Sequence, residues 1–512
     1  MPPELHSLLK AVFLVALALL LLALWFRRGR DPVTPKRRIH RVFFAALAVV
    51  FLGVYAYQGT WQLAGFARPQ FVDFMKKYNR RPDSPTKRMV RGEIRDRNGV
   101  VLAHDDPDFP GRRVYPLGAA TCHVVGYLDP KYGMTGIEAA DHPYLEGWST
   151  GTREEQARFG RNLLQSQAPR GNDLDLTLDA RLQAEALRLL GAQRGAAIVI
   201  DPRTGEILVL ASAPAFNPHK LSPDLFGGDP DRSPLLNRAV QGLYPAGSTY
   251  KMLVAAAALD RGLEPVLDCP AGGYVAAPNT PPIRDHEFYA AQRGGRAWGG
   301  YGRIGLGRAL AKSSNTYFAQ LGVQLGPESM SEHARRFLFN ESVVLFEGSS
   351  GAVRARVGKF PDLRASQRAA AAQLAIGQGD MLATPLGMAL ATAAVANDGR
   401  MMKPRLAART EPELIAGCGS PTAMRRLRTL LRGVVTEGTG RRADLPGLDV
   451  AGKTGTAQTP RGEDHAWFVC MAPAAKPRLV VVVLIEHGGY GSTAALPVAA
   501  GLLKKAQELG YF

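Results

Sequence analysis

Two apolar segments near the N-terminus constrain what this chain can form more than any other feature. Leu8–Phe26 is apolar apart from Lys10, and Val42–Tyr57 contains no charged residue. A helix needs about 17–25 predominantly apolar residues to cross a bilayer, and both segments are near the short end of that range. A lysine such as Lys10 can extend its amine to the interface. We therefore predict two transmembrane helices within residues 1–66.

A basic loop lies between the two segments. Residues 27–41 contain seven Lys and Arg residues and one acidic residue. The positive-inside rule places such a loop in the cytoplasm, so that the chain after about residue 65 lies outside it. A cleaved signal peptide is the alternative for the first segment. The basic residues of a signal precede its apolar run, however, whereas here most of them follow it.

The amino-acid composition limits what kind of protein the rest of the chain can form. The 512 residues are 46% hydrophobic, which argues against disorder, and the length suggests two or three domains. The 63 Lys and Arg residues exceed the 45 Asp and Glu residues by 18. This surplus suits an anionic membrane surface or polymer as well as nucleic acid. Because the main body is predicted to lie outside the cytoplasm, no nucleic-acid partner is expected.

Residues 67–175 are predicted to form a stalk and a separate, loop-rich module. The segment 80–85 contains two prolines and is typical of a linker. Within 91–103, an Asn-Gly turn separates two strand-like runs and predicts a hairpin. The stretch up to about residue 167 is rich in Gly, Pro and aromatic residues and shows no long helical periodicity.

Residues 176–512 are predicted to form an α+β domain. It opens with a helix over Ala180–Leu190, capped by Thr177 or Asp179. Short apolar strands are predicted over 196–201, 206–210, 466–471 and 479–485. Further helical segments are predicted over 252–259, 304–321, 367–374, 386–395 and 493–509. One sheet built from both ends of the region, with a helical lobe inserted between them, explains this order.

A Ser-x-x-Lys pattern occurs three times, so context must decide which match is meaningful. The matches are Ser7/Lys10, Ser84/Lys87 and Ser248/Lys251. The first lies at the edge of an apolar segment and the second in the stalk, where neither pair would be held rigidly. The third opens the apolar run 252–259, which puts its serine at a helix N-terminus and its lysine one turn further along the same face.

Two other motifs supply what such a serine needs. A serine hydroxyl requires a neighbouring base before it can attack a carbonyl, and a lysine serves only when it is neutral. Burial and a second cation both lower the pKa of a lysine. The chain has one Ser-x-Asn, at Ser313–Asn315, and one Lys-Thr-Gly, at Lys453–Gly455. After Ser248 and Lys251, they stand in the order found in penicillin-binding proteins and class A β-lactamases.

On these motifs the chain resembles a class B penicillin-binding protein, a peptidoglycan D,D-transpeptidase, from about residue 91 to its C-terminus. Supporting stretches are Gly195–Ser212, Asn237–Gly247, Gly377–Gly379 with Thr384 and Pro385, Ala451–Ala457, and His465–Phe468. The resemblance implies a penicillin-binding-protein or serine β-lactamase-like transpeptidase domain at 176–512, with an antiparallel sheet and an inserted helical lobe. It implies a β-rich, dimerisation-type pedestal within 67–175. It also implies the cytoplasmic membrane of a bacterium, with the catalytic domain on the periplasmic side.

The resemblance assigns a catalytic role to four residues. Ser248 would attack the carbonyl between the two terminal D-alanines of a stem peptide, and Lys251 would take its proton. Ser313 would pass a proton to the leaving amine, and Asn315 would hydrogen-bond Lys251 and the substrate amide. An amine from a neighbouring stem peptide would resolve the acyl-enzyme and form the cross-link. β-Lactams would act as covalent inhibitors.

Substrate binding is implied for the strand that carries the Lys-Thr-Gly motif. Lys453 and the hydroxyls of Thr454 and Thr456 would bind the terminal carboxylate. The backbone N–H groups of Ser248 and Thr456 would form the oxyanion hole. Gly455 would lack a side chain that could block substrate along the strand edge. No cofactor is expected, and no metal-binding cluster stands out in the sequence.

The resemblance also bears on partners. A class A penicillin-binding protein carries a glycosyltransferase domain between membrane and transpeptidase, and only about residues 65–171 are available for one here. Glycan polymerisation is then expected from a partner, for which the family suggests a SEDS-type glycosyltransferase. Class B members usually have one span, so the second predicted span is a departure that leaves the geometry of this contact open.

Three other functions share part of the pattern. A β-lactamase would have the same motifs, but no Glu-x-x-Leu-Asn pattern for activating water is present. A β-lactam sensor would acylate without turnover and would usually have more spans and a cytoplasmic signalling segment. A catalytically idle cell-wall scaffold is disfavoured because the nucleophile, the base and the anion-binding residues are all present.

Several residues have no assigned part in the motifs. The four cysteines are Cys122, Cys269, Cys418 and Cys470. They could pair in three ways, and their spacing selects none, although Cys470 lies in an apolar strand and is expected to be a buried free thiol. His465 is interpreted as structural. Arg303 and the aromatic-rich run 289–301 either line the substrate groove or form an exposed loop.

Overall fold

The computed structural model describes residues 90–109, 111–147, 170–227, 232–460 and 462–512, together with scattered positions between 43 and 54. The basic loop, the linker at 80–85 and almost all of the two predicted membrane spans lie outside the described residues. Among the residues that are described, no helix combines the length and the apolar character needed to cross a bilayer.

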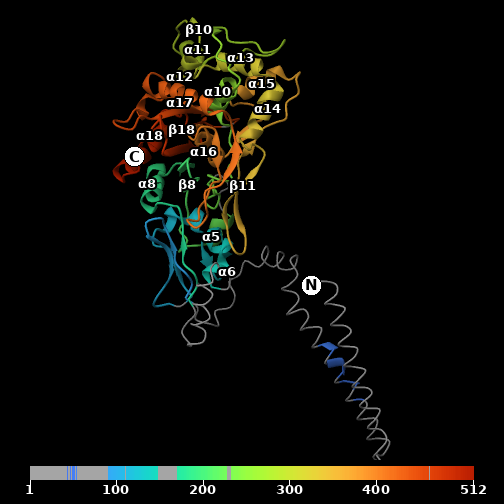
Figure 1. Cartoon of the computed structure of the whole chain (residues 1–512), viewed down its shortest axis with the longest axis vertical. Coiled ribbons are helices and arrows are strands. Elements are labelled where there is room, and N and C mark those ends of the chain that lie inside the picture. Colours follow the sequence, from blue (N-terminus) through green and yellow to red (C-terminus); the bar gives the residue numbers. More distant parts are fainter. Residues whose placement is uncertain are drawn as a thin grey trace, which may run out of the picture. The chain divides into compact units, whose positions relative to one another are not determined.

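A five-stranded antiparallel sheet forms the centre of the domain (Figure 1), in the order β17-β18-β19-β7-β8. Its strands are β7 (Gly195–Ile200), β8 (Ile207–Ala213), β17 (Ala451–Ala457), β18 (His465–Ala472) and β19 (Leu479–Ile485). The two strand groups predicted at the ends of the region therefore do join in one sheet. The strand with the Lys-Thr-Gly motif, β17, lies at its edge.

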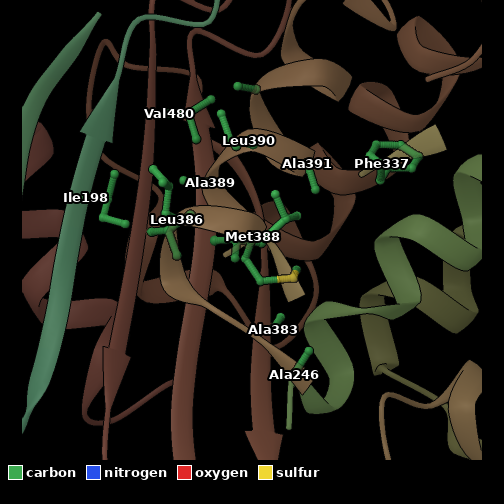
Figure 2. Packing of buried hydrophobic residues seen from close by; sticks show 14 of the residues in the cluster. Ile198, Ala246, Phe337, Ala383, Leu386, Met388, Ala389, Leu390, Ala391 and Val480 are labelled. Carbon is green, nitrogen blue, oxygen red and sulfur yellow. The ribbon is translucent and has the colours of Figure 1, made fainter. Parts of the chain in front are cut away.

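Both faces of the sheet are covered by helices, which explains why its middle strands are apolar without alternation. In β19, Val481 and Val483 pack with α8 (Ala180–Leu190) and α18 (Ala495–Glu508), whereas Val480 and Val482 belong to the cluster that includes α16 (Pro385–Ala396). Figure 2 shows Val480 and Ile198 beside the residues of α16. All twelve residues of α16 are buried, so this helix forms the core between the sheet and the helical lobe.

Two of the helix starts follow from local capping. The carboxylate of Asp179 accepts hydrogen bonds from the backbone N–H groups of Arg181 and Leu182, so Asp179 rather than Thr177 caps α8. The hydroxyl of Thr384 accepts from the backbone N–H of Gly387 and caps α16, whose first position is a proline. These caps confirm the predicted helices at both places.

The inserted lobe is helical as expected, with one difference. Its elements are η3 (Gly247–Thr249), α10 (Lys251–Asp260), α11 (His286–Arg293), α12 (Leu306–Lys312), α13 (Asn315–Leu325), α14 (Pro327–Arg336), α15 (Arg368–Ala375) and α17 (Pro421–Thr436). The single helical segment predicted over 304–321 was wrong. Ser313 has a φ of 57° and ends α12, and the Ser314 hydroxyl then caps α13 by accepting from the backbone N–H of Tyr317.

The module before residue 176 contains a small sheet and short helices. Its elements are β1 (Ile94–Arg95), β2 (Val101–Asp105), β3 (Arg113–Val114), η2 (Gly118–Ala120), α4 (Cys122–Val125), β4 (Leu128–Asp129), β5 (Gly133–Met134), α5 (Gly136–Ala140), α6 (His142–Leu145) and β6 (Leu174–Asp175). The predicted hairpin is present between β1 and β2. Gly99 adopts a φ of 80° in its turn, and Asp96 accepts hydrogen bonds from the backbone of Asn98 and Val100.

Shorter elements complete the described chain. They are α9 (Pro223–Gly227), β9 (Leu267–Pro270), β10 (Gly300–Ile304), β11 (Ser342–Glu347), β12 (Ala352–Arg356), β13 (Gly358–Lys359), β14 (Leu382–Ala383), β15 (Arg400–Met402), β16 (Leu414–Gly417) and η4 (Arg441–Ala443). The tip of the β11–β12 hairpin is hydrogen-bonded to the N-terminal module at the end of α5. There, Ser349 N donates to the Asp141 carboxylate, and the Ser350 hydroxyl donates to the carbonyl of Ala139.

The packing of α16 generates a stability prediction. A Cβ added at Gly387 would lie 1.9 Å from the carbonyl oxygen of Val357, whereas one added at Gly433 in α17 would meet nothing closer than Glu437 Oε1 at 3.9 Å. Gly387→Ala should lower the free energy of unfolding by about 1–3 kcal/mol through overpacking. Gly433→Ala should leave it unchanged or raise it by up to about 1 kcal/mol. Chemical denaturation of both variants tests this packing, and equal stabilities would contradict it.

Candidate active site

The three motifs lie together beside the free edge of the sheet. Ser248 is in the turn η3, and Lys251 is the first residue of α10. Ser313 stands between α12 and α13, and Asn315 begins α13. Within the described chain, no further strand pairs with the outer edge of β17, which carries the residues from Lys453 onwards.

Members of all three motifs line one cavity of about 590 Å³. The residues around it are Ser248, His286, Glu287, Tyr289, Arg293, Lys312, Ser313, Asn315, Ile376, Gln378, Thr439, Thr454, Gly455, Thr456, Gln458, Asp464, Tyr490 and Ser492. Most of them are polar, so the cavity suits a peptide with charged ends rather than an apolar ligand.

Close backbone packing places Ser248 against the edge strand. Gly247, with a φ of 53°, lies so near β17 that a Cβ there would come within 2.5 Å of the Thr456 carbonyl oxygen. The backbone N–H of Gly247 donates to the carbonyl of Gly377 at 2.9 Å. From β18, the Trp467 ring N–H donates to the Pro245 carbonyl at 3.0 Å. Hydrogen bonds with Gly377 and Trp467 thus hold the turn of Ser248 from two sides.

Lys251 is fully buried and held by the Ser-x-Asn segment. Its Nζ donates to the Ser313 carbonyl oxygen and to Asn315 Oδ1, both at 2.6 Å, and lies 3.3 Å from Ser313 Oγ. The left-handed backbone of Ser313 ends α12, which leaves its carbonyl oxygen available to the lysine. The ring of Phe318 lies 5.8 Å from the same nitrogen.

Lys453 approaches the same serine from the sheet. Its Nζ donates to Ser313 Oγ at 2.8 Å and to the carbonyl oxygen of Thr454 at 3.0 Å. The side chain is fully buried and is not among the residues that line the cavity. Two lysines, from α10 and β17, therefore meet at the hydroxyl of Ser313.

Burial changes the proton affinity of both lysines. It lowers the pKa of Lys251 to about 7, although the carboxylates of Asp285 and Glu287 raise it. Burial and the positive charge of Lys251 hold the pKa of Lys453 well below the usual value of a lysine. A lysine in water has a pKa near 10.4. The lowered pKa makes a neutral Lys251 amine accessible near pH 7.

Sequence reasoning missed Asp285, which contacts the Ser-x-Asn motif directly. Its carboxylate accepts hydrogen bonds from the backbone N–H groups of Asn315 and Thr316 at the start of α13, and the residue is only 1% exposed. The carbonyl of Arg284 accepts from Asn315 Nδ2 at 2.9 Å. A lone aspartate 30 residues before a helix carries no pattern. Only the fold could reveal this contact.

Gly455 lines the cavity, and its lack of a side chain has a further structural reason. A Cβ there would lie 2.7 Å from Thr249 Cγ2 and 3.0 Å from Trp467 Cβ, so it would collide with the protein's own side chains before any substrate. The glycine is required because η3 packs directly on β17. This contact brings the turn of Ser248 to the strand.

The threonines of the motif face the cavity as expected. Thr454 and Thr456 line it, and Thr454 Oγ1 shares a hydrogen bond of 2.6 Å with the hydroxyl of Thr439 from the loop after α17. Of the aromatic-rich run, Tyr289 and Arg293 line the cavity, whereas Arg303 does not. The run therefore contributes to the groove in part.

The remaining residues singled out in the sequence lie apart from this cavity. His465 is buried in β18, and its Nδ1 accepts from the backbone N–H of His487 at 3.1 Å, which agrees with a structural role. Burial lowers the pKa of His465 to about 4. All four cysteines are free and buried, so none of the three pairings forms and Cys470 is a buried thiol as predicted. No cluster that could hold a metal occurs among the described residues.

Comparison with known families agrees with the architecture. Residues 195–504 match the model of the penicillin-binding protein transpeptidase domain, and residues 91–174 match that of the penicillin-binding protein A dimerisation domain. The chain belongs to the penicillin-binding protein transpeptidase family. The first match covers more than half of the chain and includes all three motifs of this penicillin-binding protein.

Relatives and solved structures of the family are similar along most of their length. A peptidoglycan D,D-transpeptidase, PbpA, from Mycolicibacterium smegmatis is 31% identical over 460 residues, which cover 82% of this chain and 89% of the relative. The corresponding MrdA from Acinetobacter baumannii is 32% identical, over 76% of this chain and 66% of the relative. The structure of penicillin-binding protein A from M. tuberculosis as a ceftriaxone acyl-enzyme has a TM-score of 0.72 at 28% identity, covering 82% and 98% of the two chains.

The contact between η3 and β17 can be tested by a pair of substitutions. Gly455→Ala should push Thr249 and the turn of Ser248 away from the strand and lower the rate of acylation by a labelled penicillin roughly 10²-fold. Thr249→Ser removes the methyl group that the new Cβ would meet but keeps the hydroxyl that donates to the Ala246 carbonyl. Added to Gly455→Ala, it should restore part of the rate. An unchanged acylation rate in Gly455→Ala would contradict this role of the glycine.

Proposed function

We propose that this protein is a peptidoglycan D,D-transpeptidase that cross-links stem peptides through an acyl-enzyme on Ser248 and is acylated by β-lactams. The supporting observation is that the buried Lys251 is hydrogen-bonded to Ser313 and Asn315, which line the same cavity as Ser248. The printed names of its relatives are those of peptidoglycan D,D-transpeptidases.

The first chemical step is the activation of Ser248. A neutral lysine amine has two N–H bonds and one lone pair. The two short hydrogen bonds of Lys251, to the Ser313 carbonyl and to Asn315, account for both N–H bonds. The lone pair then remains for the proton of Ser248, which lies three residues earlier in the turn η3 that precedes α10. The serine oxygen attacks the carbonyl of the penultimate D-alanine as that proton moves to Lys251.

Proton delivery to the leaving group falls to Ser313. Its hydroxyl lies 3.3 Å from Lys251 Nζ and 2.8 Å from Lys453 Nζ, so it can accept a proton from one side as it releases its own into the cavity. The amine of the terminal D-alanine leaves with that proton, and the ester on Ser248 remains. Lys453, which reaches Ser313 Oγ from the sheet, supports this transfer and keeps the site electropositive for the terminal carboxylate.

The edge strand binds the substrate. Thr454 and Thr456 present hydroxyls to the C-terminal carboxylate of the stem peptide, and the positive charge in the lysine pair favours this anion. The backbone N–H groups of Ser248 and Thr456 form the oxyanion hole, where each donor contributes roughly 3–4 kcal/mol in comparable enzymes. An amine from a second stem peptide then attacks the ester, takes the acyl group and releases Ser248.

The proposal extends to the rest of the chain. Residues 1–66 anchor it by two transmembrane helices in a bacterial cytoplasmic membrane, with the basic loop 27–41 inside. Residues 67–175 form the stalk and pedestal, and 176–512 form the transpeptidase domain on the periplasmic side. Since the described residues include no glycosyltransferase-like domain, a SEDS-type glycosyltransferase in the membrane supplies the glycan strand. The family-model matches at 91–174 and 195–504 support this division.

Covalent labelling tests the central claim. A fluorescent penicillin should label the full chain stably, and Ser248→Ala should abolish the label. Ser84→Ala, which alters another serine followed by a lysine three residues later, is the matched control and should label normally. Rapid release of hydrolysed drug would instead indicate a β-lactamase, and no labelling would leave a scaffold. Formation of a cross-linked dimer from two stem peptides separates the transpeptidase from a sensor.

The pH dependence of acylation provides a separate test. Because Lys251 must be neutral to accept the serine proton and its pKa is lowered to about 7, the acylation rate should fall below about pH 7. On that acidic side the rate should drop tenfold for each pH unit. Stopped-flow measurement of penicillin acylation between pH 5 and 9 checks this, because the range extends about two pH units to either side of the lowered pKa. An acylation rate that still rises steeply at pH 9, as expected for a lysine with the usual pKa of about 10.4, would contradict a lowered pKa at Lys251.

A further inference from the structure

Asp285 lies directly behind the catalytic motifs, although it belongs to none of them. It precedes α11, is 1% exposed and does not line the cavity. Its Oδ1 accepts from the backbone N–H groups of Asn315 and Thr316. The preceding residue, Arg284, accepts from Asn315 Nδ2 through its carbonyl oxygen. Two consecutive residues therefore hold Asn315 by its backbone and by its side chain.

These hydrogen bonds determine where the side-chain amide oxygen of Asn315 points. With Nδ2 committed to Arg284, Oδ1 is the atom left to face Lys251, and it accepts from Lys251 Nζ at 2.6 Å. An asparagine free to flip would present an NH₂ group to the lysine instead and repel its N–H bonds. The position of Lys251 thus depends on a contact made outside the three motifs.

Asp285 also places a negative charge among buried positive groups. Its second oxygen, Oδ2, is buried and has no hydrogen-bond partner. Lys251 and Lys453 are both fully buried nearby, joined through Ser313. A carboxylate in a medium of low polarity acts over several ångströms, and it favours a proton on a neighbouring amine.

Several ionisable groups interact with the Asp285 carboxylate or with Lys251. The pKa of Lys251 is lowered by burial and raised by Asp285 and, less strongly, by Glu287. Glu287 is half-buried at the cavity wall, so solvent screens its charge more than that of Asp285. Burial chiefly raises the pKa of two other neighbours, the Tyr301 hydroxyl and the Cys269 thiol, and the charge of Asp285 raises it further. Both therefore stay neutral near pH 7.

We propose that Asp285 is a positioning residue of this site: it orients Asn315 and supplies the buried negative charge that lets Lys251 hold the proton taken from Ser248. The inference rests on the proposed transpeptidase function. Asp285 gives the two buried lysines a negatively charged neighbour, and this neighbour is in contact with the Ser-x-Asn motif. The serine, lysine and asparagine of the motifs are then not sufficient for acylation, because the site also needs an acidic residue from a separate loop.

Two substitutions separate the two parts of this role. Asp285→Asn keeps an oxygen for the N–H groups of Asn315 and Thr316 but removes the charge. Without the charge Lys251 binds its proton less tightly, so the acid limb of the acylation profile should move to lower pH by roughly one unit. The limiting rate at high pH should fall, because a weaker base accepts the serine proton less well. Asp285→Ala also removes the acceptor of the Asn315 and Thr316 N–H groups and should lower the acylation rate roughly 10²-fold at all pH values.

The matched control is Asp179→Asn. Asp179 is likewise a buried carboxylate that accepts hydrogen bonds from backbone N–H groups at the start of a helix, but its helix α8 packs on β8, at the opposite edge of the sheet from β17. This variant should lose stability and keep the wild-type pH profile of acylation. Thermal unfolding of each full-length variant, measured beside acylation by a fluorescent penicillin, distinguishes lost folding from a changed site.

The outcomes decide between the claims. A wild-type chain that is not labelled would contradict the proposed function itself. If the wild type is labelled and Asp285→Asn has an unchanged acid limb, or one shifted to higher pH, the proposal for Asp285 is wrong. Failure of Asp285→Asn to fold would also overturn it, because its contribution would then be to folding alone.

Discussion

Burial of two lysine side chains against one serine hydroxyl is the constraint on which the site depends. Lys251 and Lys453 come from a helix of the inserted lobe and from the edge strand of the sheet, and both reach Ser313. An isolated ammonium buried in this way would be costly, so part of the charge is lost and the hydrogen bonds must be satisfied. The helix α12 therefore ends at Ser313, whose carbonyl oxygen and hydroxyl accept hydrogen bonds from the lysines.

The surrounding fold meets this requirement by close backbone contacts rather than by large side chains. Glycines at 247, 377 and 455 stand where a Cβ would collide with backbone or with Thr249. They allow the turn of Ser248 to rest on β17. The fully buried helix α16 packs under the same elements and against the central strands, so the lobe and the sheet share one core. The geometry of the site thus follows from how the inserted helical lobe packs on the sheet.

The polar character of the cavity complements these buried lysines. Its walls present hydroxyls and amides near Ser248, while Glu287 and Asp464 lie among the residues on its α11 side and β18 side. Lys251 and Lys453 do not line the cavity and are not exposed to solvent. Their charge is therefore less screened than that of a surface cation, and it favours an anionic substrate terminus in the groove.

Much of this could be predicted from the sequence because the information is local. Apolar runs predicted the strands β7, β8, β18 and β19, an Asn-Gly pair predicted the hairpin near residue 98, and three short motifs predicted which residues gather in the site. The break at Ser313, the reason for Gly455 and the part of Asp285 could not be predicted in this way. Each depends on atoms that are neighbours only after folding: a helix that must end where two lysines meet, a turn that rests on a strand, and a carboxylate 30 residues from the N–H groups it binds. Sequence patterns record periodicity and spacing along the chain, whereas steric contact and charge compensation between distant segments are decided by tertiary packing.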